Sequence, residues 1–249
     1  MTNVAVLGAR GRMGKTVCQA VTDADDLQLV AELDAGDEVT RETVAGADAV
    51  VDFTVPDATK GNVLAALAAG CHVVVGTTGW TDAGLAEVEA AAGAAGRNVI
   101  IAPNFALSSV LAMHFAALAA PYFESAEVIE LHHPKKLDAP SGTAAATAKK
   151  IAAARAASGS AAMPDATAAD PDGTRGGLID GVRVHALRVS GLTAHEEILL
   201  GNPGELLTIR TDSFDRQSFM PGVLLAVRKV GGLPGLTVGL DHVMDLPGR

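Results

Sequence analysis

The feature that most constrains the fold is a glycine-rich turn between a short apolar run and a helical stretch. Val4–Leu7 predicts a buried strand, and the segment after it carries Gly8, Gly11 and Gly14 at three-residue intervals. Glycines let the backbone turn tightly and approach a pyrophosphate, whose charge is stabilised by the free amides and dipole of the helix that follows. This arrangement favours a dinucleotide-binding βαβ unit at the start of the chain.

The rest of the first hundred residues alternates β-branched apolar runs with alanine-rich helical stretches. Such alternation predicts a parallel sheet covered by helices on both faces. The expected strands are 4–7, 27–33, 49–53, 72–75 and 99–102, and the expected helices are 12–24, 57–69 and 82–95.

The pattern changes after residue 105. The expected elements are a helix over 106–122, a strand over 126–132, a helix over 143–157, a long loop over 158–180, three consecutive antiparallel strands over 182–189, 196–200 and 205–209, a helix over 217–230 and a short strand over 236–240. The fold class is therefore α/β with two domains. A Rossmann-like parallel-sheet domain takes residues 1–105 and the returning tail 216–249. An α+β domain takes residues 106–215 and has an open, mostly antiparallel or mixed sheet.

Asp34 ends the second expected strand, 20 residues after Gly14. An acidic residue there accepts hydrogen bonds from the adenosine ribose, although it could also be a solvated turn residue. Such a carboxylate disfavours the 2′-phosphate of NADP, whereas Arg10 and Arg12 in the glycine turn could neutralise one. We therefore expect NADH, NADPH or both as cofactors.

Two further segments lie at expected strand ends, where ligands of open α/β sheets bind. Residues 76–79 read Gly-Thr-Thr-Gly and residues 102–105 read Ala-Pro-Asn-Phe, and both suit a nicotinamide ribose or an ordinary turn. The residues predicted to bind the cofactor are Gly8, Ala9, Arg10, Gly11, Arg12, Met13, Asp34, Gly76, Thr77, Thr78, Ala102, Pro103, Asn104 and Phe105.

The most specific segment, residues 132–143, reads HHPKKLDAPSGT and runs from a strand end through a loop into a helix. Ser141 is a favourable N-cap residue. The amides of Gly142 and Thr143 then form an anion site at the helix N-terminus, and Lys136 adds a positive charge. In an otherwise acidic chain, this segment predicts a carboxylate-binding site.

The histidine pair brings proton transfer near neutral pH to the same segment. Adjacent strand residues point to opposite faces, so His133 could simply pack while His132 serves the site. Adjacent histidines without a set of Cys or carboxylate ligands do not suit zinc, and no metal is expected. Lys135 is expected to be solvated, and Asp138 either orients Lys136 or forms a turn.

The composition excludes several classes of partner. A formal net charge of −10 repels nucleic acid and anionic membranes, and only 3% of the residues are aromatic. We expect no membrane span, because no apolar run reaches the required length of roughly 18 residues, and no secretory signal. Two unpaired cysteines, Cys18 and Cys71, fit a reducing compartment, so the expected location is cytoplasmic.

Taken together, the glycine turn, the segments 76–79 and 102–105 and the motif HHxxKxDxPSGT resemble the dihydrodipicolinate reductase family, also called 4-hydroxy-tetrahydrodipicolinate reductases. The resemblance covers nearly the whole chain in order. Asp34, Arg10 and Arg12 resemble the actinobacterial branch of that family more than the branch with an NADP-binding arginine beside the second strand.

The resemblance implies NAD(P)H-dependent reduction of a cyclic imine dicarboxylate to tetrahydrodipicolinate, in lysine and diaminopimelate biosynthesis. It also implies a homotetramer built through the second-domain sheets. On this basis His132 is the general acid/base, and Lys136 is a proton donor and electrostatic partner. The substrate carboxylates are held by His133, Ser141, Gly142 and Thr143.

Two other functions remain open from the residues alone. One is another two-domain NAD(P)-dependent amino-acid or semialdehyde dehydrogenase. A semialdehyde dehydrogenase needs a nucleophilic cysteine, but Cys18 falls in an expected helix and Cys71 precedes a strand. The other is a non-catalytic NADH sensor, which would have no need of the proton donors at 132–136.

Overall fold

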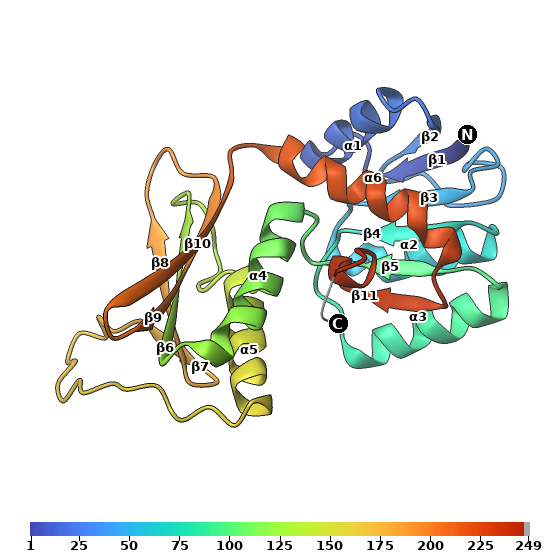
Figure 1. Cartoon of the computed structure of the whole chain (residues 1–249). Helices are drawn as coiled ribbons and strands as arrows, with labels where there is room; N and C mark the ends of the chain where they lie inside the picture. Colours follow the sequence, from blue (N-terminus) through green and yellow to red (C-terminus); the bar gives the residue numbers. More distant parts are fainter. Residues whose placement is uncertain (247–249) are drawn as a thin grey trace. The chain divides into compact units, whose positions relative to one another are not determined.

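The computed structural model describes residues 1–246, which form two compact units (Figure 1). Unit 1 comprises Met1–Ala106 and Arg216–Leu246, and unit 2 comprises Leu107–Asp215. The last three residues of the range 216–249 expected in the first domain lie outside the described residues. Unit 1 is thus built from both ends of the chain, and unit 2 from its continuous middle.

Unit 1 contains a six-stranded parallel sheet in the order β11-β5-β4-β3-β1-β2. Its strands are β1 (Thr2–Leu7), β2 (Leu27–Leu33), β3 (Ala49–Asp52), β4 (His72–Val75), β5 (Val99–Ile101) and β11 (Leu236–Val238). The central strands are apolar on both sides, as a sheet covered on both faces requires. The expected Rossmann-like architecture is confirmed.

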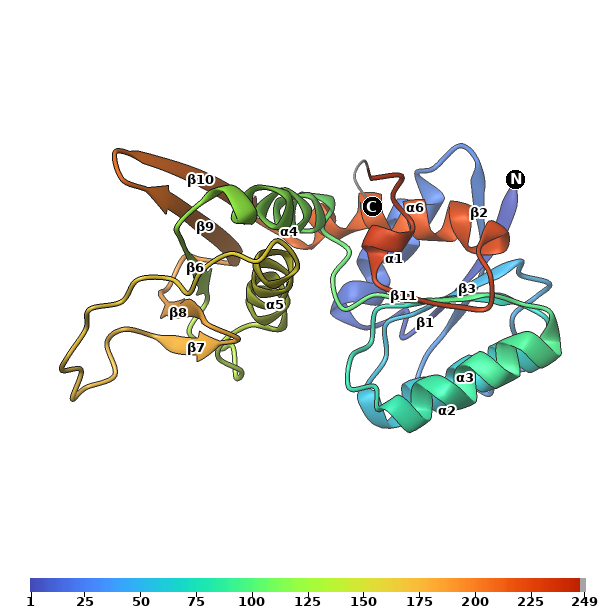
Figure 2. The ribbon, with the colours of Figure 1, turned by 60° about the horizontal axis from the view of Figure 1, so that its bottom comes forward.

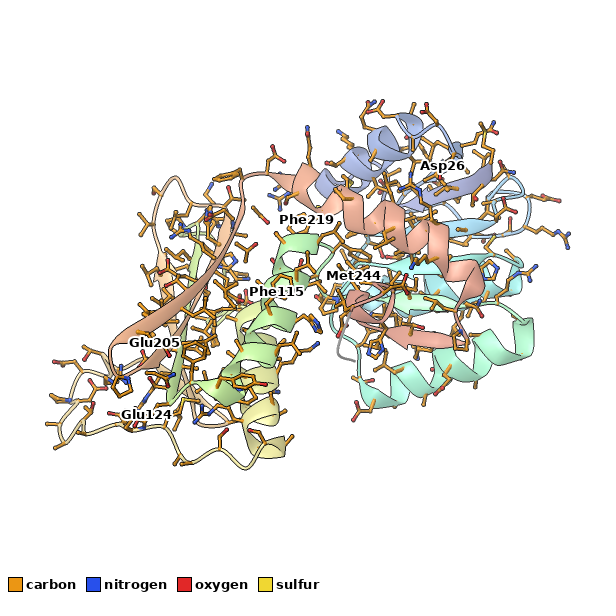
Figure 3. All side chains as sticks on the ribbon, in the orientation of Figure 1. Asp26, Phe115, Glu124, Glu205, Phe219 and Met244 are labelled. Carbon is orange, nitrogen blue, oxygen red and sulfur yellow. The ribbon has the colours of Figure 1, made fainter. Side chains whose placement is uncertain are left out.

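Helices cover both faces of this sheet. They are α1 (Arg12–Thr22), α2 (Pro56–Ala68), α3 (Asp82–Ala95) and α6 (Met220–Lys229), with short 3-10 turns η2 (Arg216–Phe219), η3 (Val230–Gly232) and η4 (Leu240–His242). Figure 2 shows α2 and α3 on one face and α1 and α6 on the other. The tail is tied to the first segment by the pairing of β11 with β5. It is also held by Arg228, which donates to both oxygens of Asp26, labelled in Figure 3.

Two elements of the tail are shorter in the structure than the sequence predicts. The helix expected over 217–230 divides into η2 and α6, because Pro221 lacks an N–H and favours the first turn of a helix. The strand expected over 236–240 ends at Val238, because Gly239 adopts a left-handed φ of +100° and η4 follows.

Unit 2 contains a five-stranded mixed sheet in the order β10-β9-β6-β8-β7. Its elements are α4 (Leu107–Ala119), η1 (Ala120–Tyr122), β6 (Ser125–His132), α5 (Gly142–Ala157), β7 (Gly177–Ile179), β8 (Val182–Arg188), β9 (Ala194–Asn202) and β10 (Glu205–Ser213). Both α4 and α5 lie on one side of this sheet (Figure 1). Alternate residues of β6 are buried in the core beneath them: Ala126, Val128 and Glu130.

The expectation of three consecutive antiparallel strands after residue 180 is wrong for the first of them. β8 pairs in parallel with β6 and antiparallel with the unexpected short strand β7, whereas β9 pairs antiparallel with β6 and β10. A parallel pair requires a long crossover, and α5 with the segment 158–176 supplies it. β6 thereby becomes the central strand, with hydrogen-bonded neighbours on both sides.

No helix within residues 1–246 is both long enough and apolar enough to cross a membrane.

Candidate active site

In unit 1, the turn between β1 and α1 requires glycine at two positions. Gly8 has a left-handed φ of +74°, and a Cβ there would lie 2.6 Å from the Phe53 carbonyl oxygen. A Cβ on Gly14 would lie 2.0 Å from the Gly8 carbonyl oxygen. The Gly11 amide closes the turn by donating to Gly8 O at 2.9 Å. The turn therefore presents main chain to a ligand.

Asp34 lies just beyond β2, and main-chain donors fix its carboxylate. Oδ2 accepts from the Arg10 amide at 2.7 Å and Oδ1 from the Ala35 amide at 2.8 Å. These hydrogen bonds, that of Ala35 foremost, hold the pKa of Asp34 below its ordinary value. Each carboxylate oxygen can accept a second hydrogen bond, so Asp34 can still bind a ribose hydroxyl.

A cavity of about 490 Å³ connects these two features. Gly8, Gly11 and Asp34 line it. Residues beyond those expected from the sequence complete the lining: Leu7, Leu33, Ala35, Gly36, Asp37, Val39, Phe53, Thr54, Val55, Ala58 and Asn62. Among the expected residues, Arg10 and Arg12 are exposed and Met13 is half-buried, while Ala9 is buried.

The ends of β3 and β4 are held together by a fully buried carboxylate, Asp52. Asp52 Oδ1 accepts from the Thr77 hydroxyl at 2.8 Å and from the Thr54 amide at 2.9 Å, and Oδ2 accepts from the Asn62 amide group at 3.2 Å. The Thr77 side chain thus faces inward, and its contribution to the cofactor site stays a prediction. Its neighbour Thr78 is exposed.

Nearby, Gly76 and the segment 102–105 provide packing as well as exposed surface. A Cβ on Gly76 would lie 2.0 Å from the Phe53 ring, so only glycine fits there. Phe105 is buried against Phe53, with ring centroids 5.8 Å apart, and Ala102 is buried too. Of this segment Pro103 is exposed, and Asn104 accepts the Ala106 amide at 2.8 Å.

These residues suit a dinucleotide. The glycine turn leaves no room for side chains near the helix N-terminus, and the cavity extends from it to a carboxylate at the end of β2. Pyrophosphate and adenosine ribose require that combination of main-chain amides and an acceptor. The expected cofactor residues therefore gather along one edge of the sheet, although not every side chain faces the ligand.

In unit 2, the centre of the candidate site is Glu130, a fully buried carboxylate on β6. Arg188, at the end of β8, donates Nη2 to Oε1 and Nη1 to Oε2, each at 2.8 Å. Oε1 also accepts the Ser141 amide at 3.0 Å, and Oε2 contacts His132 Nδ1. Burial opposes the charge, but the hydrogen bonds from Arg188 and His132 outweigh it and lower the pKa of Glu130.

His132 lies two residues after Glu130, on the same face of β6. Because an ionised carboxylate can only accept, His132 Nδ1 carries the hydrogen of this contact and Nε2 is left for proton transfer. Burial lowers the pKa of His132, Glu130 opposes that shift, and the charges of Lys136 and Arg188 reinforce it. The resting imidazole is therefore neutral at neutral pH.

The loop after His132 separates its two lysines. Lys136 is largely covered and pairs with Asp138 at 2.8 Å, so Asp138 orients Lys136 as one of the two expectations had it. Lys135 and His133 are both exposed. Arg188 Nη2 also donates to the Asp138 carbonyl at 2.8 Å, which joins this loop to the Glu130 network.

α5 begins directly after this loop. The Ser141 side chain caps it, accepting the Ala144 amide at 3.1 Å, as expected of an N-cap residue. Gly142 is exposed and Thr143 is half-buried in the first turn. Unit 2 thus brings together His132, Lys136 and the N-terminus of α5, the features of an anion site with a proton source.

Glu130 and Arg188 were not expected from the sequence. Glu130 could have been found, because it lies two residues before His132 on a strand whose other inward residues are apolar. Arg188 carried no such signal, since its contact depends on the parallel pairing of β8 with β6. Asp52 was also missed, although it too stands at the carboxyl end of a strand.

Neither cysteine suits a semialdehyde dehydrogenase. Cys18 and Cys71 are both buried, and burial raises the pKa of both thiols, to about 11 for Cys18. A catalytic cysteine needs a lowered pKa and access to substrate. Within residues 1–246, no group of three or more His, Cys, Asp or Glu residues is arranged to hold a metal ion.

Comparisons with known proteins agree on one family over nearly the whole chain. Residues 2–105 match the family model "Dihydrodipicolinate reductase, N-terminus" and residues 108–244 match "Dihydrodipicolinate reductase, C-terminus". A 4-hydroxy-tetrahydrodipicolinate reductase of Beutenbergia cavernae is 66% identical over 245 residues, which are 98% of each chain. That of Bifidobacterium animalis subsp. lactis is 61% identical, over 99% of this chain and 100% of the relative.

A solved structure gives the same result. The dipicolinate-bound dihydrodipicolinate reductase from Paenisporosarcina sp. TG-14 has a TM-score of 0.85 and 36% identity, and the match covers 98% of this chain and 100% of that one. The resemblance seen in the sequence is confirmed, and the chain belongs to the dihydrodipicolinate reductase family.

Proposed function

We propose that this chain reduces 4-hydroxy-tetrahydrodipicolinate, by way of dihydrodipicolinate, to tetrahydrodipicolinate with NADH or NADPH. The observation that carries the proposal is the unit 2 site. There a neutral histidine is held by a buried, ionised glutamate next to Lys136 and a helix N-terminus. Relatives of this family are named 4-hydroxy-tetrahydrodipicolinate reductases, and one solved member binds dipicolinate, a flat dicarboxylate. The reaction belongs to lysine and diaminopimelate biosynthesis.

In the proposed reaction, unit 1 holds the cofactor and unit 2 binds the substrate and supplies the proton. The reduced dinucleotide, when its pyrophosphate is bound at the glycine turn of unit 1, supplies hydride from its nicotinamide ring. Lys136 and the first-turn amides of Gly142 and Thr143 bind the substrate carboxylates and offset their charge. Ser141 caps the helix that carries these amides. The exposed His133 adds a further contact to a substrate carboxylate. His132 Nε2 takes up a proton from solvent and donates it to the ring that receives the hydride, and the imidazole then returns to its neutral form while Glu130 keeps Nδ1 protonated throughout.

The deciding experiment is a steady-state assay with the cyclic intermediate and each cofactor in turn. Turnover with at least one of them supports the proposal. Another two-domain amino-acid or semialdehyde dehydrogenase would ignore this substrate and oxidise or reduce its own. Dipicolinate should raise the melting temperature in the presence of NADH, whereas a non-catalytic NADH sensor would show no such shift.

The assembly and location complete the proposal. We infer a homotetramer formed through the unit 2 sheet face opposite α4 and α5, which carries exposed apolar side chains such as Leu187 and Leu206. Light scattering at working concentration tests it, and a monomer would contradict it. Two buried, unpaired cysteines suit the reducing cytoplasm, where we place the enzyme.

A further inference from the structure

A second buried carboxyl group lies beside Glu130. Glu196 of β9 is the direct cross-strand partner of Glu130 in the antiparallel pairing of β6 with β9, and it is only 4% exposed. Both side chains lie on the core face of the sheet, under α5. Two carboxyl groups that share a buried site do not both ionise readily, because like charges repel strongly where water is excluded.

The hydrogen-bond partners of the two carboxyls are unequal. Glu130 accepts from Arg188, His132 and the Ser141 amide, which together stabilise its ionised form. Within residues 1–246, Glu196 has one hydrogen bond, from Oε1 to the Thr147 hydroxyl at 2.8 Å, and its buried Oε2 has no partner. A proton shared by the pair therefore belongs on Glu196.

The Thr147 hydroxyl can accommodate either protonation state of Glu196. It lies 3.1 Å from the Thr143 carbonyl, one helical turn earlier in α5, and 2.8 Å from Glu196 Oε1. A hydroxyl has a single hydrogen but can also accept. If Thr147 donates to the Thr143 carbonyl, a protonated Glu196 donates to Thr147, and both contacts are satisfied.

In the described part of the chain, no cation offsets the charge of Glu196 among the groups that face it. β6 contributes Glu130, α5 contributes Thr147, and β10 contributes Thr211 at the directly opposed position. Thr211 in turn contacts the Ser108 hydroxyl of α4 at 2.7 Å. Apart from Glu130, the facing groups are neutral hydroxyls.

We propose that Glu196 is a positioning residue that holds a proton beside Glu130 and, through Glu130, sets the proton affinity of His132. Burial, together with the charge of Glu130, raises the pKa of Glu196 to about 7 against the opposing hydrogen bond of Thr147. Glu196 therefore changes its ionisation state around neutral pH. Its catalytic consequence rests on the proposed function of His132 as the proton donor.

The sign of the effect follows from the charges around His132. Glu130 favours the imidazolium, and Lys136 and Arg188 disfavour it. Ionisation of Glu196 above neutral pH adds a negative charge nearby, which makes the imidazolium more stable. The acid form of His132 then persists to higher pH than it would beside a neutral residue at 196.

Infrared spectroscopy tests the protonation directly and needs no turnover. Protein labelled with ¹³C-glutamate should show the carbonyl band of a protonated carboxylic acid at about pH 6, lost with a midpoint near the pKa of about 7. E196Q should lack the band. Thr147→Val should shift its frequency, because the hydrogen-bond partner is removed. Absence of any such band in the wild-type enzyme overturns the proposal, and this titration does not depend on whether a variant folds.

The pH profile of kcat/KM tests the link to His132. The value of kcat/KM for E196Q, divided by that of the wild type, should fall roughly three- to tenfold between about pH 6 and about pH 8.5. The reason is that the amide cannot ionise and so cannot stabilise the imidazolium at higher pH. Glu197→Gln is the matched control, because the next residue of β9 pairs with Arg210 on the opposite face and its ratio should stay constant. A constant ratio for E196Q overturns the link, whereas inactivity of the wild-type chain contradicts the proposed function and leaves the infrared result standing.

Discussion

The candidate sites of the two units are built from different materials. In unit 1 the glycine turn presents main chain, and Asp34, a half-buried carboxylate that lines the cavity, is held by backbone amides. In unit 2 the site is a cluster of charges, in which Arg188, His132 and the Ser141 amide surround the buried Glu130. The unit 1 site depends on main-chain geometry, and the unit 2 site depends on the electrostatics of a buried carboxylate.

This difference predicts how each site fails. A substitution in the glycine turn should change cofactor affinity in a way that is nearly independent of pH, because main-chain geometry does not titrate. A substitution in the Glu130 cluster should change turnover or stability in a way that depends on pH, because a buried charge loses its compensation. The following substitutions test that division.

His132→Ala should give the largest effect. Removal of a positioned general acid costs roughly 10²–10⁴-fold in kcat, while NADH binding in unit 1 should be nearly unchanged. Stopped-flow or steady-state assays at saturating NADH, with NADH affinity measured separately by fluorescence, check both halves. Near-normal turnover would show that the proton comes from elsewhere.

Arg188→Met should destabilise the chain by about 3–5 kcal/mol, because it leaves Glu130 buried without its bidentate partner. The folded-state pKa of Glu130 is lowered in the wild type, so its contribution is present at neutral pH and is lost as the pH falls below the ordinary value of 4.5. Denaturant-unfolding experiments should therefore show the largest difference in free energy of unfolding between wild type and Arg188→Met at neutral pH, and a smaller difference at acidic pH.

Arg228→Met provides the control for that measurement. Arg228 forms an ion pair with Asp26 in unit 1, and both side chains are about half exposed. Exposed pairs contribute about 1 kcal/mol or less. An equal loss of stability in the two variants would mean that burial of Glu130 is not the deciding factor.

Lys136→Ala should lower kcat and raise KM together, each by roughly tenfold or more, since a charge-assisted contact to a carboxylate is lost. Lys135→Ala should change both constants by less than about twofold, because an exposed lysine interacts weakly with its surroundings. Steady-state kinetics of the two variants side by side provide the comparison. Equal damage in both would disprove the assignment of Lys136.

Gly14→Ala should weaken NADH binding roughly tenfold to hundredfold, because overpacking against a main-chain atom costs about 1–3 kcal/mol. Gly61→Ala in α2 is the matched control, since a Cβ there would meet nothing within 4 Å. Titration of NADH fluorescence at two pH values measures the effect. A loss that varied strongly with pH would break the division between the two sites.

Asp34→Ala should have the smallest of these effects, about tenfold on NADH affinity, through loss of a charge-assisted hydrogen bond to the ribose. NADPH affinity should fall less, because the carboxylate repels a 2′-phosphate that the exposed Arg10 and Arg12 can approach. Equilibrium titrations with both cofactors decide the matter. Equal losses would remove Asp34 from the ribose site.

The same contrast explains what the sequence could predict. The glycine turn, the parallel sheet and the cap at Ser141 depend on local rules, so the residues near them were found directly. The pairing of β8 with β6 joins segments more than fifty residues apart in the chain, and local patterns do not reveal it. Arg188 was missed for that reason, and the inward orientation of Thr77 was missed because Asp52 comes from another strand.

The division of unit 1 into two segments has a consequence for the order of events during synthesis. Unit 2 is continuous, so all its residues have been translated before α6 and β11 are made. Domains generally fold as units during translation. Unit 2, which holds the charge cluster, can therefore fold first. The dinucleotide-binding unit keeps an open sheet edge at β5 until β11 has been translated and pairs with it. The segment 1–106 of unit 1 is thus translated first, but the fold to which it belongs is completed after that of unit 2.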